Sequence, residues 1–218
     1  MASSSIDAFK ASVKSDFARP NLFVVDLAFP GALKLGGDGG ATASSQLTAL
    51  GQFTVRAANL PSSQMGVIEV PYRGRVLKIA GDRTFEPWTV TIMNDTNFSL
   101  RSAMEAWFSA VQAYNENYTS LGTLGDASDQ TGYFADMSVT QLSRDATEGG
   151  SSSASGTSDK TPKALRKYNF VNVFPSNISA IDLDFGSNDA IEEFTVELQV
   201  QYWTPAVTGK DSGNKTGS

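Results

Sequence analysis

The sequence predicts a mainly β protein: an antiparallel β-barrel or sandwich with one flanking α-helix and a short N-terminal helix. Three observations predict this class. At least seven segments have the alternation or the β-branched content of strands, and one segment repeats apolar residues at helical spacing. The 218 residues suffice for one substantial core, and all-β domains of this length are often single.

The N-terminal segment 5–14 predicts a short amphipathic helix, because Ile6, Phe9 and Val13 share one face and Ser5 can cap it. A helix of this length is not stable alone. It must therefore pack either on its own barrel or on a neighbouring copy of the chain.

Two strands separated by a long loop follow. Residues 21–29 predict a strand, and residues 52–58 predict a second one with Phe53 and Val55 on the same face. Between them, residues 31–52 hold four glycines within positions 36–40, which deny the backbone a regular preference. We expect a mobile loop there. The face of the first strand is formed by Phe23, Val25, Leu27 and Phe29.

Segment 67–93 predicts strands interrupted by turn residues. Residues 67–70 and 73–79 are expected to be strands on either side of Pro71, which cannot donate to a ladder. Gly81-Asp82 predicts a turn. The strand that follows Pro87 is expected to bury Trp88, Val90 and Ile92.

Segment 97–114 predicts the flanking helix, with its cap within residues 95–97 and its apolar stripe packed on a sheet face. Each buried side chain of the stripe should contribute about 1.5–3 kcal/mol. The stripe consists of Leu100, Ala103, Met104, Trp107, Phe108 and Val111.

Three further strands are predicted at residues 133–142, 166–174 and 193–203. Residues 148–163 are low in complexity and predict a flexible loop, and residues 204–218 predict a polar tail. The last strand is the most regular, and its inward face is expected to hold Phe194, Val196, Leu198, Val200 and Tyr202.

Composition excludes most chemistry. Cysteine and histidine are absent, which rules out disulfides, thiolate or imidazole metal sites and His-based triads. Carboxylate pairs such as Asp182 with Asp184 could suggest hydrolysis or calcium binding, but no further oxygen ligands stand at a recognisable spacing. We therefore expect no enzyme activity, no cofactor and no metal.

The net charge of −6 comes from one segment. Residues 168–209 contain no Lys or Arg and six of the 23 acidic residues, which leaves 17 to balance the 17 basic ones. Neutralising phosphates needs the opposite sign, so a nucleic-acid-binding module is not expected. Neither a membrane helix nor a secretory signal is present, so we expect folding in a cytoplasm.

Three blocks of sequence match a known family in order and approximate spacing. They are DFARPNLF (residues 16–23), AGDRTFEPWTVTIMND (80–95) and FPSNISAIDLDFGSNDAIEEFTVELQVQYW (174–203). Together they resemble the tail tube proteins of T-even-like contractile-tailed bacteriophages. The chain departs from that pattern at residues 31–52 and 148–163, which are long where tight connections are expected, and after Trp203.

The resemblance implies a structural virion protein assembled in the host bacterial cytoplasm. Its protomers would form hexameric rings that stack into the tube inside the tail sheath. The implied partners are further copies of the chain, the sheath protein, the tape-measure protein, and the baseplate and tail terminator proteins. DNA would pass through the lumen without specific binding. Residues 1–218 would be one tail tube domain: an arm (1–16), the barrel (17–203) with inserted loops 31–52 and 148–163, and a tail (204–218).

Two other functions stay open on sequence grounds. The first is the inner tube of a phage-derived contractile injection system that delivers protein, and the neighbouring genes would distinguish it. The second is a carbohydrate-binding β-sandwich, which predicts an exposed aromatic platform, whereas the aromatics of this chain alternate inward.

Candidate assembly residues are Arg19, Asp82, Arg83 and Glu86. The turn expected at 81–83 could place Arg83 against a carboxylate of a neighbouring copy. Alternatively, Arg83 forms a local ion pair with Asp82 or Glu86, which would add little stability.

A candidate acidic face consists of Asp182, Asp184, Glu193 and Glu197. It could line the lumen and keep DNA from binding, or it could dock a basic segment of the sheath protein. The third possibility is an ordinary solvated strand face.

Overall fold

The computed structural model describes residues 6–12, 17–31, 33, 44–115, 118–119, 121, 132–148 and 160–206. The chain divides into two compact units. Residues 1–24, 140–167 and 207–218 belong to the first unit, and residues 25–139 and 168–206 to the second. Within the described ranges, no helix is long and apolar enough to cross a membrane.

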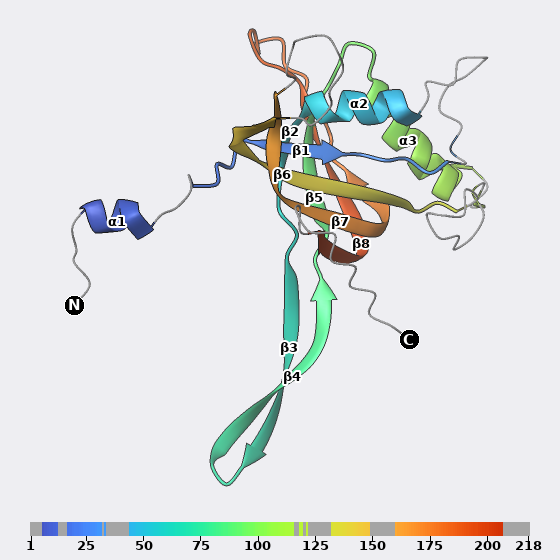
Figure 1. The fold of residues 1–218 in the computed structure, drawn as a ribbon. Helices are drawn as coiled ribbons and strands as arrows, with labels where there is room; N and C mark the ends of the chain where they lie inside the picture. Colours follow the sequence, from blue (N-terminus) through green and yellow to red (C-terminus); the bar gives the residue numbers. More distant parts are fainter. Residues whose placement is uncertain are drawn as a thin grey trace. The chain divides into compact units, whose positions relative to one another are not determined.

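Six strands form one sheet in the order β1-β6-β7-β8-β5-β2, and β3 pairs with β4 in a separate two-stranded sheet (Figure 1). The predicted fold class, mainly β with a flanking helix and a short N-terminal helix, is confirmed. In chain order the elements are α1 (Ile6–Ser12), β1 (Phe23–Asp26), α2 (Ser44–Thr54), β2 (Val55–Ala58), β3 (Ser63–Tyr72), β4 (Arg75–Phe85), β5 (Trp88–Met93), α3 (Ser99–Val111), β6 (Ala135–Glu148), β7 (Lys160–Ile178) and β8 (Glu193–Ala206).

The first unit contains the predicted N-terminal helix, α1. The rings of Phe9 and Phe17 stack with centroids 6.3 Å apart. Ile6 and Phe9 nevertheless remain 71% and 57% exposed. In the same unit, the Leu142 N–H donates to the Leu22 carbonyl over 2.9 Å. The apolar face of α1 is thus only partly covered.

The core of the second unit follows from strand alternation. β5 and β8 run antiparallel with Val90 opposite Val196, so the inward residues of both strands lie on the same face of the sheet. The side chains of Trp88 and Phe170 stack at 4.2 Å in this core. The predicted inward residues Trp88, Val90, Ile92, Phe194, Val196 and Leu198 are all buried.

One end of β8 differs from the prediction. Tyr202, expected inward, is 42% exposed. The reason is the register: pairing with β5 ends where Trp88 faces Leu198, so later residues of β8 extend beyond the core.

The helix α3 packs its predicted stripe inward, burying Leu100, Ala103, Met104 and Trp107. The Trp107 indole N–H donates to the Tyr133 carbonyl over 2.9 Å, which satisfies its polar group inside the core. The residue at the N-cap position is Phe98, outside the expected range 95–97, and its side chain makes no cap bond. Asp95 nevertheless contributes to this end of the helix, because its carboxylate accepts from the Ser99 N–H at 2.8 Å.

The loop expected over residues 31–52 is wrong in its second half, where α2 forms. Leu47 is buried and the Thr48 hydroxyl donates to the Leu27 carbonyl over 2.8 Å. The predicted strand begins only at Val55, and Phe53 is 80% exposed on the helix. Sequence patterns do not reveal this helix because its buried side includes a glycine, Gly51, instead of a large apolar residue. The helix packs closely there: a Cβ added to Gly51 would lie only 3.3 Å from the Leu27 side chain. Residues 34–43 lie outside the described ranges.

Three of the observed strands, β6, β7 and β8, extend further than predicted. Strand β6 reaches Glu148 and β7 begins at Lys160, so only residues 149–159 of the expected flexible loop remain, outside the described ranges. Strand β8 continues to Ala206, three residues into the expected tail. Strand pairing joins backbone groups, so it can extend through polar side chains that carry no alternation signal.

Candidate interaction surfaces

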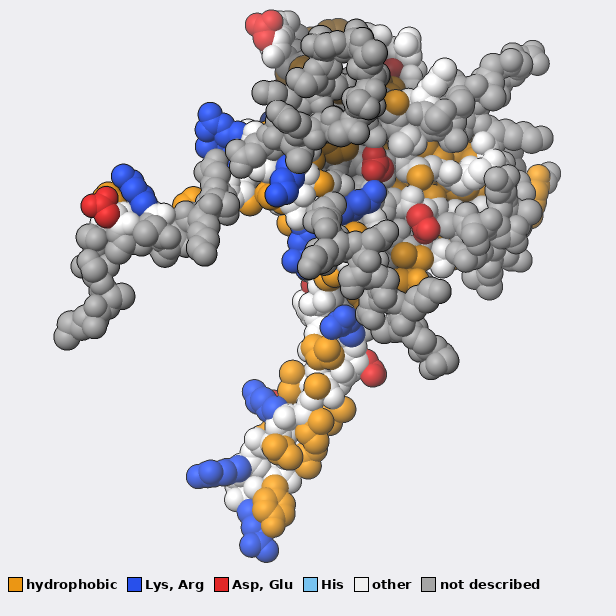
Figure 2. Space-filling model, in the orientation of Figure 1, with side chains coloured by type: hydrophobic (Ala, Val, Ile, Leu, Met, Phe, Trp, Pro, Cys, Tyr) orange, Lys and Arg blue, Asp and Glu red, His pale blue; other side chains and the backbone are white. Residues whose placement is uncertain are grey.

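The hairpin formed by β3 and β4 is the most exposed part of the second unit. All ten positions of β3 and nine of the eleven positions of β4 are exposed. Figure 2 shows hydrophobic side chains along the hairpin and Lys and Arg side chains toward its outer end. Its exposed large apolar residues are Met65, Val67, Ile68, Val70, Tyr72, Val76, Leu77 and Ile79.

The register sorts these residues onto two faces. Ile68 lies opposite Ile79 and Val70 opposite Leu77, and residues directly opposite on paired strands share a face. We call these four residues the apolar face. The other face includes Glu69 opposite Lys78, whose charged atoms are 3.7 Å apart.

The root of the hairpin is fixed to the core. The Trp88 indole N–H donates to the Asn59 carbonyl over 2.8 Å, and the Trp203 indole N–H donates to the Ser62 carbonyl over 3.2 Å. The Trp203 ring also packs edge-on against Phe85, with centroids 6.3 Å apart. The two hydrogen bonds join the segment before β3 to β5 and β8, and the Phe85 contact joins the end of β4 to β8, so the hairpin leaves the core in a defined direction.

Two glycines let the hairpin strands approach closely partway along their length. The register shifts between Met65 and Val67. A Cβ on Gly81 would lie 3.2 Å from the Gly66 backbone, and one on Gly66 would lie 3.3 Å from the Asp82 carbonyl oxygen. The expected turn at Gly81-Asp82 is therefore wrong: both residues belong to β4, at a bulge.

The hairpin reverses direction at Arg73-Gly74, which we call, with Tyr72 and Arg75, the hairpin tip. Arg73 and Gly74 have φ values of 44° and 80°, which suit a tight two-residue turn. The Arg73 guanidinium lies 5.5 Å from the centre of the Tyr72 ring. Pro71, expected to interrupt pairing, lies within β3 opposite Val76.

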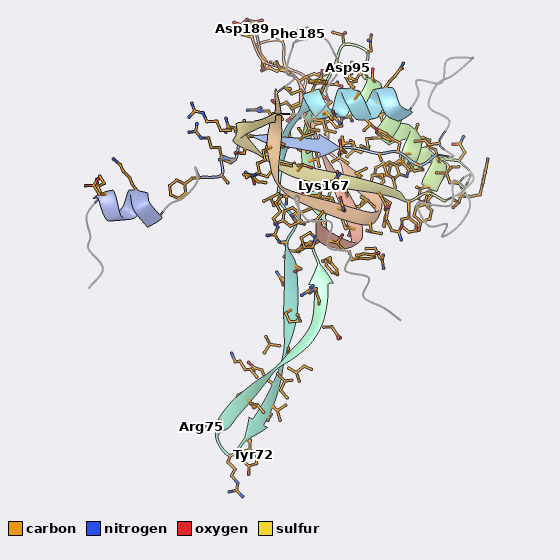
Figure 3. All side chains as sticks on the ribbon, in the orientation of Figure 1. Tyr72, Arg75, Asp95, Lys167, Phe185 and Asp189 are labelled. Carbon is orange, nitrogen blue, oxygen red and sulfur yellow. The ribbon has the colours of Figure 1, made fainter. Side chains whose placement is uncertain are left out.

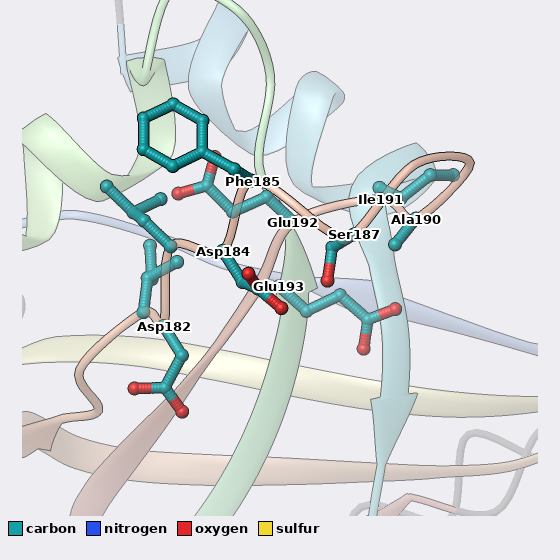
Figure 4. Close-up of a pocket in the computed structure, with 10 residues that line it drawn as sticks. Asp182, Asp184, Phe185, Ser187, Ala190, Ile191, Glu192 and Glu193 are labelled. Carbon is teal, nitrogen blue, oxygen red and sulfur yellow. The ribbon is translucent and has the colours of Figure 1, made fainter.

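A second surface surrounds a pocket formed by residues 181–193. The pocket has a volume of about 450 Å³, and Figure 4 shows the Phe185 ring and acidic side chains around it. Phe185 is 108% exposed relative to a reference residue, and Leu183 is 85% exposed. We call this the acidic pocket. It is lined by Ile181, Asp182, Leu183, Asp184, Phe185, Ser187, Ala190, Ile191, Glu192 and Glu193.

Backbone turns hold the loop that forms the acidic pocket. The Asp184 carboxylate accepts from the Gly186 N–H at 3.0 Å, and the Asp184 carbonyl accepts from the Ser187 N–H at 3.2 Å. The loop is also tied to the end of β5, because the Asn94 N–H donates to the Glu192 carbonyl over 2.9 Å.

The predicted assembly residues separate in the structure. Asp82 and Arg83 are exposed on β4, and Glu86 is exposed at the hairpin root. Within the described residues Arg83 forms no ion pair with Asp82 or Glu86, while Glu86 accepts from the Gln64 side-chain amide over 2.7 Å. Arg19 belongs to the first unit, where its carbonyl accepts from the Gln141 side chain over 2.9 Å.

The predicted acidic residues divide between loop and strand. Asp182 and Asp184 are exposed in the acidic pocket. Glu193 is half-buried at the start of β8 and bonds to Arg56 of β2. Glu197 is half-buried further along β8, opposite Thr89.

Sequence reasoning missed the apolar face of the hairpin: it predicts strands at residues 67–70 and 73–79 but does not single out their exposed apolar side chains. It named three residues of the acidic pocket, Asp182, Asp184 and Glu193, but not the apolar side chains around them. Among the described residues, no group of three or more Asp and Glu side chains is placed to hold a metal ion.

Comparison with known proteins places the whole chain in a family. The phage tail tube protein family model matches residues 18–206. Tail tube protein gp19 of Enterobacteria phage T4 is 30% identical over 200 residues, covering 90% of this chain and 97% of that protein. The tail tube protein of Serratia phage KSP90 is 26% identical over 141 residues, covering 65% and 67%.

Solved structures agree at the level of the fold. A chain of the anti-feeding prophage baseplate, six-fold symmetrised, aligns with a TM-score of 0.52 at 14% identity over 90% of this chain and 99% of that one. A chain of the anti-feeding prophage cap aligns with a TM-score of 0.53 at 16% identity over 88% and 93%. The fold matches these anti-feeding prophage chains, and the sequence matches phage tail tube proteins. The chain belongs to the phage tail tube protein family, whose members are structural, non-enzymatic components of the virion tail.

Proposed function

We propose that this chain assembles with copies of itself into hexameric rings, and that the rings stack into the inner tube of a contractile phage tail. Phage DNA passes through the lumen of that tube. The observation that carries the proposal is the exposed hairpin, because the protomer leaves it without a covering layer.

The hairpin needs a partner on physical grounds. An isolated two-stranded hairpin is at best marginally stable in water. Here Leu77 is 60% exposed and Ile68 is 54% exposed, and contiguous exposed apolar surface of this kind marks interaction sites. A second copy of the chain is the occupant that family membership favours.

Strand edges offer a second means of self-association. β1 and β2 are the outermost strands of the six-stranded sheet. Backbone N–H and C=O groups at such edges can pair with another chain. Pairing around a closed ring would satisfy these edges by symmetry. The exposed Ile6 and Phe9 of α1 add a further apolar surface for a neighbouring copy.

The charge of the chain suits a conduit for DNA. The net charge is −6, with no Lys or Arg between residues 168 and 209. A lumen that bound phosphates would retain the genome. We infer that DNA passes without specific binding, and that candidate acidic residues such as Glu197 contribute to this repulsion.

The remaining partners follow from the architecture of a contractile tail. The tube lies inside the sheath protein and encloses the tape-measure protein before the DNA enters. A baseplate protein and a terminator protein contact its two ends. Solved structures with this fold include a baseplate and a cap, which supports the placement of such contacts at the ends of a tube.

Negative-stain electron microscopy of the purified protein tests the proposal. We expect rings or tubes with six-fold end views that increase with protein concentration. The Ile68→Lys/Leu77→Lys variant should remain folded by circular dichroism and form no tubes. The matched control, Val67→Lys/Val76→Lys, places the same charges on the other face of the hairpin and should interfere less. A wild-type protein that stays monomeric at every concentration would contradict the proposed function.

An injection-system tube that delivers protein is the second candidate, supported by the fold likeness to anti-feeding prophage chains. The 30% identity to a phage tube over 90% of the chain favours the phage. Capsid and terminase genes beside this gene would decide for the phage. Family membership argues against the carbohydrate-binding alternative.

A further inference from the structure

We propose that the hairpin tip of one copy docks into the acidic pocket of a second copy, and that this contact joins successive rings. The proposal rests on the proposed function and names the surfaces that meet. The tip is basic and aromatic, and the pocket is lined by acidic side chains and by exposed apolar ones. The two surfaces are complementary in charge and in polarity.

The hairpin tip presents one aromatic ring between two cationic side chains. Tyr72 is 67% exposed, and Arg73 and Arg75 are exposed on either side of Gly74. The nearest carboxylate along the hairpin, Glu69, already faces Lys78. Because the turn fixes the backbone, the tip loses little conformational freedom on docking.

The acidic pocket has the opposite character. Its apolar side chains, Leu183, Phe185 and Ile191, are 85%, 108% and 67% exposed, so the protomer leaves them open to a partner. Arg56 compensates Glu193, whereas Asp182 and Glu192 form no ion pair among the described residues. A volume of about 450 Å³ is within the range of pockets that enclose ligands, which leaves room for an aromatic side chain.

The positions of the two surfaces rule out a meeting within one chain. β5 links them: its first residue, Trp88, follows the hairpin, and its last residue, Met93, lies opposite Glu193 of the pocket. A six-residue strand separates these ends by about 17 Å, and the ten-residue β3 carries the tip about 30 Å further. Figure 3 shows Tyr72 and Arg75 at one end of the second unit and Phe185 and Asp189 at the other.

Such an arrangement is head-to-tail. One end of the copy carries the inserting element, and the other end carries the receptor. Interfaces of this kind propagate along an axis because each added copy presents the same receptor again. The proposal assigns Asp182 and Asp184 to contacts between rings, whereas the sequence had suggested the lumen or the sheath.

Cysteine cross-linking tests the contact directly, because the chain has no cysteine of its own. One population carries Tyr72→Cys and the other Phe185→Cys. Disulfides form only between residues whose Cα atoms are within about 7 Å. After co-assembly and mild oxidation we expect a covalent dimer at twice the 23.2 kDa monomer mass, which reducing agent removes. The control partner, Phe53→Cys, is also exposed, at 80%, and should give no dimer.

Charge exchange provides the second test. Arg73→Glu/Arg75→Glu and Asp182→Lys/Glu192→Lys should each abolish tubes, and the chain that carries all four substitutions should regain them. Asp184 is left intact because its carboxylate holds the loop turn. Isolated rings from the two single-surface variants would support a role between rings.

The outcomes separate the two proposals. Tubes co-assembled from the Tyr72→Cys and Phe185→Cys variants without a disulfide between them, or charge variants that assemble like wild type, would overturn the docking of tip and pocket and leave the tube intact. Four substitutions that fail to restore tubes in a folded chain would also count against the pairing. If the wild-type protein forms neither rings nor tubes, the proposed function itself fails.

Discussion

At the scale of single residues, buried polar groups and glycines control the second unit. Trp107 and Trp88 are almost completely buried, yet each indole N–H has a carbonyl partner. Asn94 differs, because both polar atoms of its side chain are buried without a partner among the described residues. Its backbone N–H bonds to Glu192 of the acidic pocket loop. If a contact between stacked rings of the protein rearranged this loop, the Asn94 side-chain amide would be free to form new hydrogen bonds.

Trp107→Phe should destabilise the second unit by about 1–3 kcal/mol, because the Tyr133 carbonyl loses its donor inside the core. Chemical denaturation measures this loss, carried out in the Ile68→Lys/Leu77→Lys background so that assembly does not add to the stability. Trp203→Phe is the matched control: its N–H bonds to Ser62 in a half-exposed setting. An equal loss at both positions would show that packing and not the buried hydrogen bond dominates.

Gly81→Val should prevent tubes while its melting temperature matches that of the monomeric Ile68→Lys/Leu77→Lys variant. The new side chain would meet the Gly66 backbone at 3.2 Å, which forces the two hairpin strands apart. Electron microscopy and thermal melting check the two halves of this prediction. The control is Ala80→Val, a neighbouring position on the same strand that already carries a Cβ. Normal tubes from Gly81→Val would mean that the bulge geometry is dispensable.

At the scale of elements, the sequence specifies what is buried better than what is exposed. The strands at 88–93 and 193–198 were predictable because their buried side chains, Trp88 and Val196 among them, alternate with exposed or half-buried ones. The helix at 99–111 was predictable because its buried side chains, such as Trp107, recur every three or four residues. The helix α2 was not, because its buried face uses Gly51 and Thr48 beside Leu47, and these residues carry no apolar period.

The hairpin was predicted only in part for a different reason. Its alternation satisfies the pattern of a buried strand, yet the described part of this chain leaves it exposed. The acidic pocket was found only in part: the candidate acidic face included Asp182, Asp184 and Glu193, but the apolar lining comes from a loop whose residues follow no period. Sequence patterns report that a side chain needs covering, and they do not say which chain covers it.

Replacing residues 67–80 by a short turn should leave a folded protein that forms no tubes. The segment contributes no buried side chain to the core, while the hydrogen bonds at the root, from Trp88 and Trp203, remain. Circular dichroism melting and electron microscopy measure both effects. A melting temperature far below that of the monomeric Ile68→Lys/Leu77→Lys variant would mean that the hairpin supports the protomer, contrary to its exposure.

At the scale of the whole molecule, the protomer combines a well-packed core with apolar surfaces that the described part of the chain leaves exposed. The core strands β5 and β8 satisfy their backbone groups within the chain. Among the described residues, the outer strands β1 and β2 each have one edge without a partner strand in the sheet. The hairpin and α1 keep large apolar side chains exposed. Stability should therefore be uneven across the chain before assembly and more uniform afterwards.

Amide hydrogen exchange should reveal this change. In the monomeric Ile68→Lys/Leu77→Lys variant we expect slow exchange in β5 and β8 and fast exchange in β3, β4 and β2. In wild-type tubes the hairpin and β2 should become protected. Exchange measured by mass spectrometry on both samples resolves these segments. A hairpin already protected in the monomer would contradict the need for a second copy.

The position of the hairpin and the acidic pocket at opposite ends of β5 has one more consequence. A stack joined in this way is polar, so its two terminal rings are chemically different and can be recognised by different proteins. Such a stack also has no built-in end, because every newly added ring presents the same free binding surface as the ring before it. Nothing in the chemistry of such a joint counts rings, so the length of the finished tube must be measured out by another molecule.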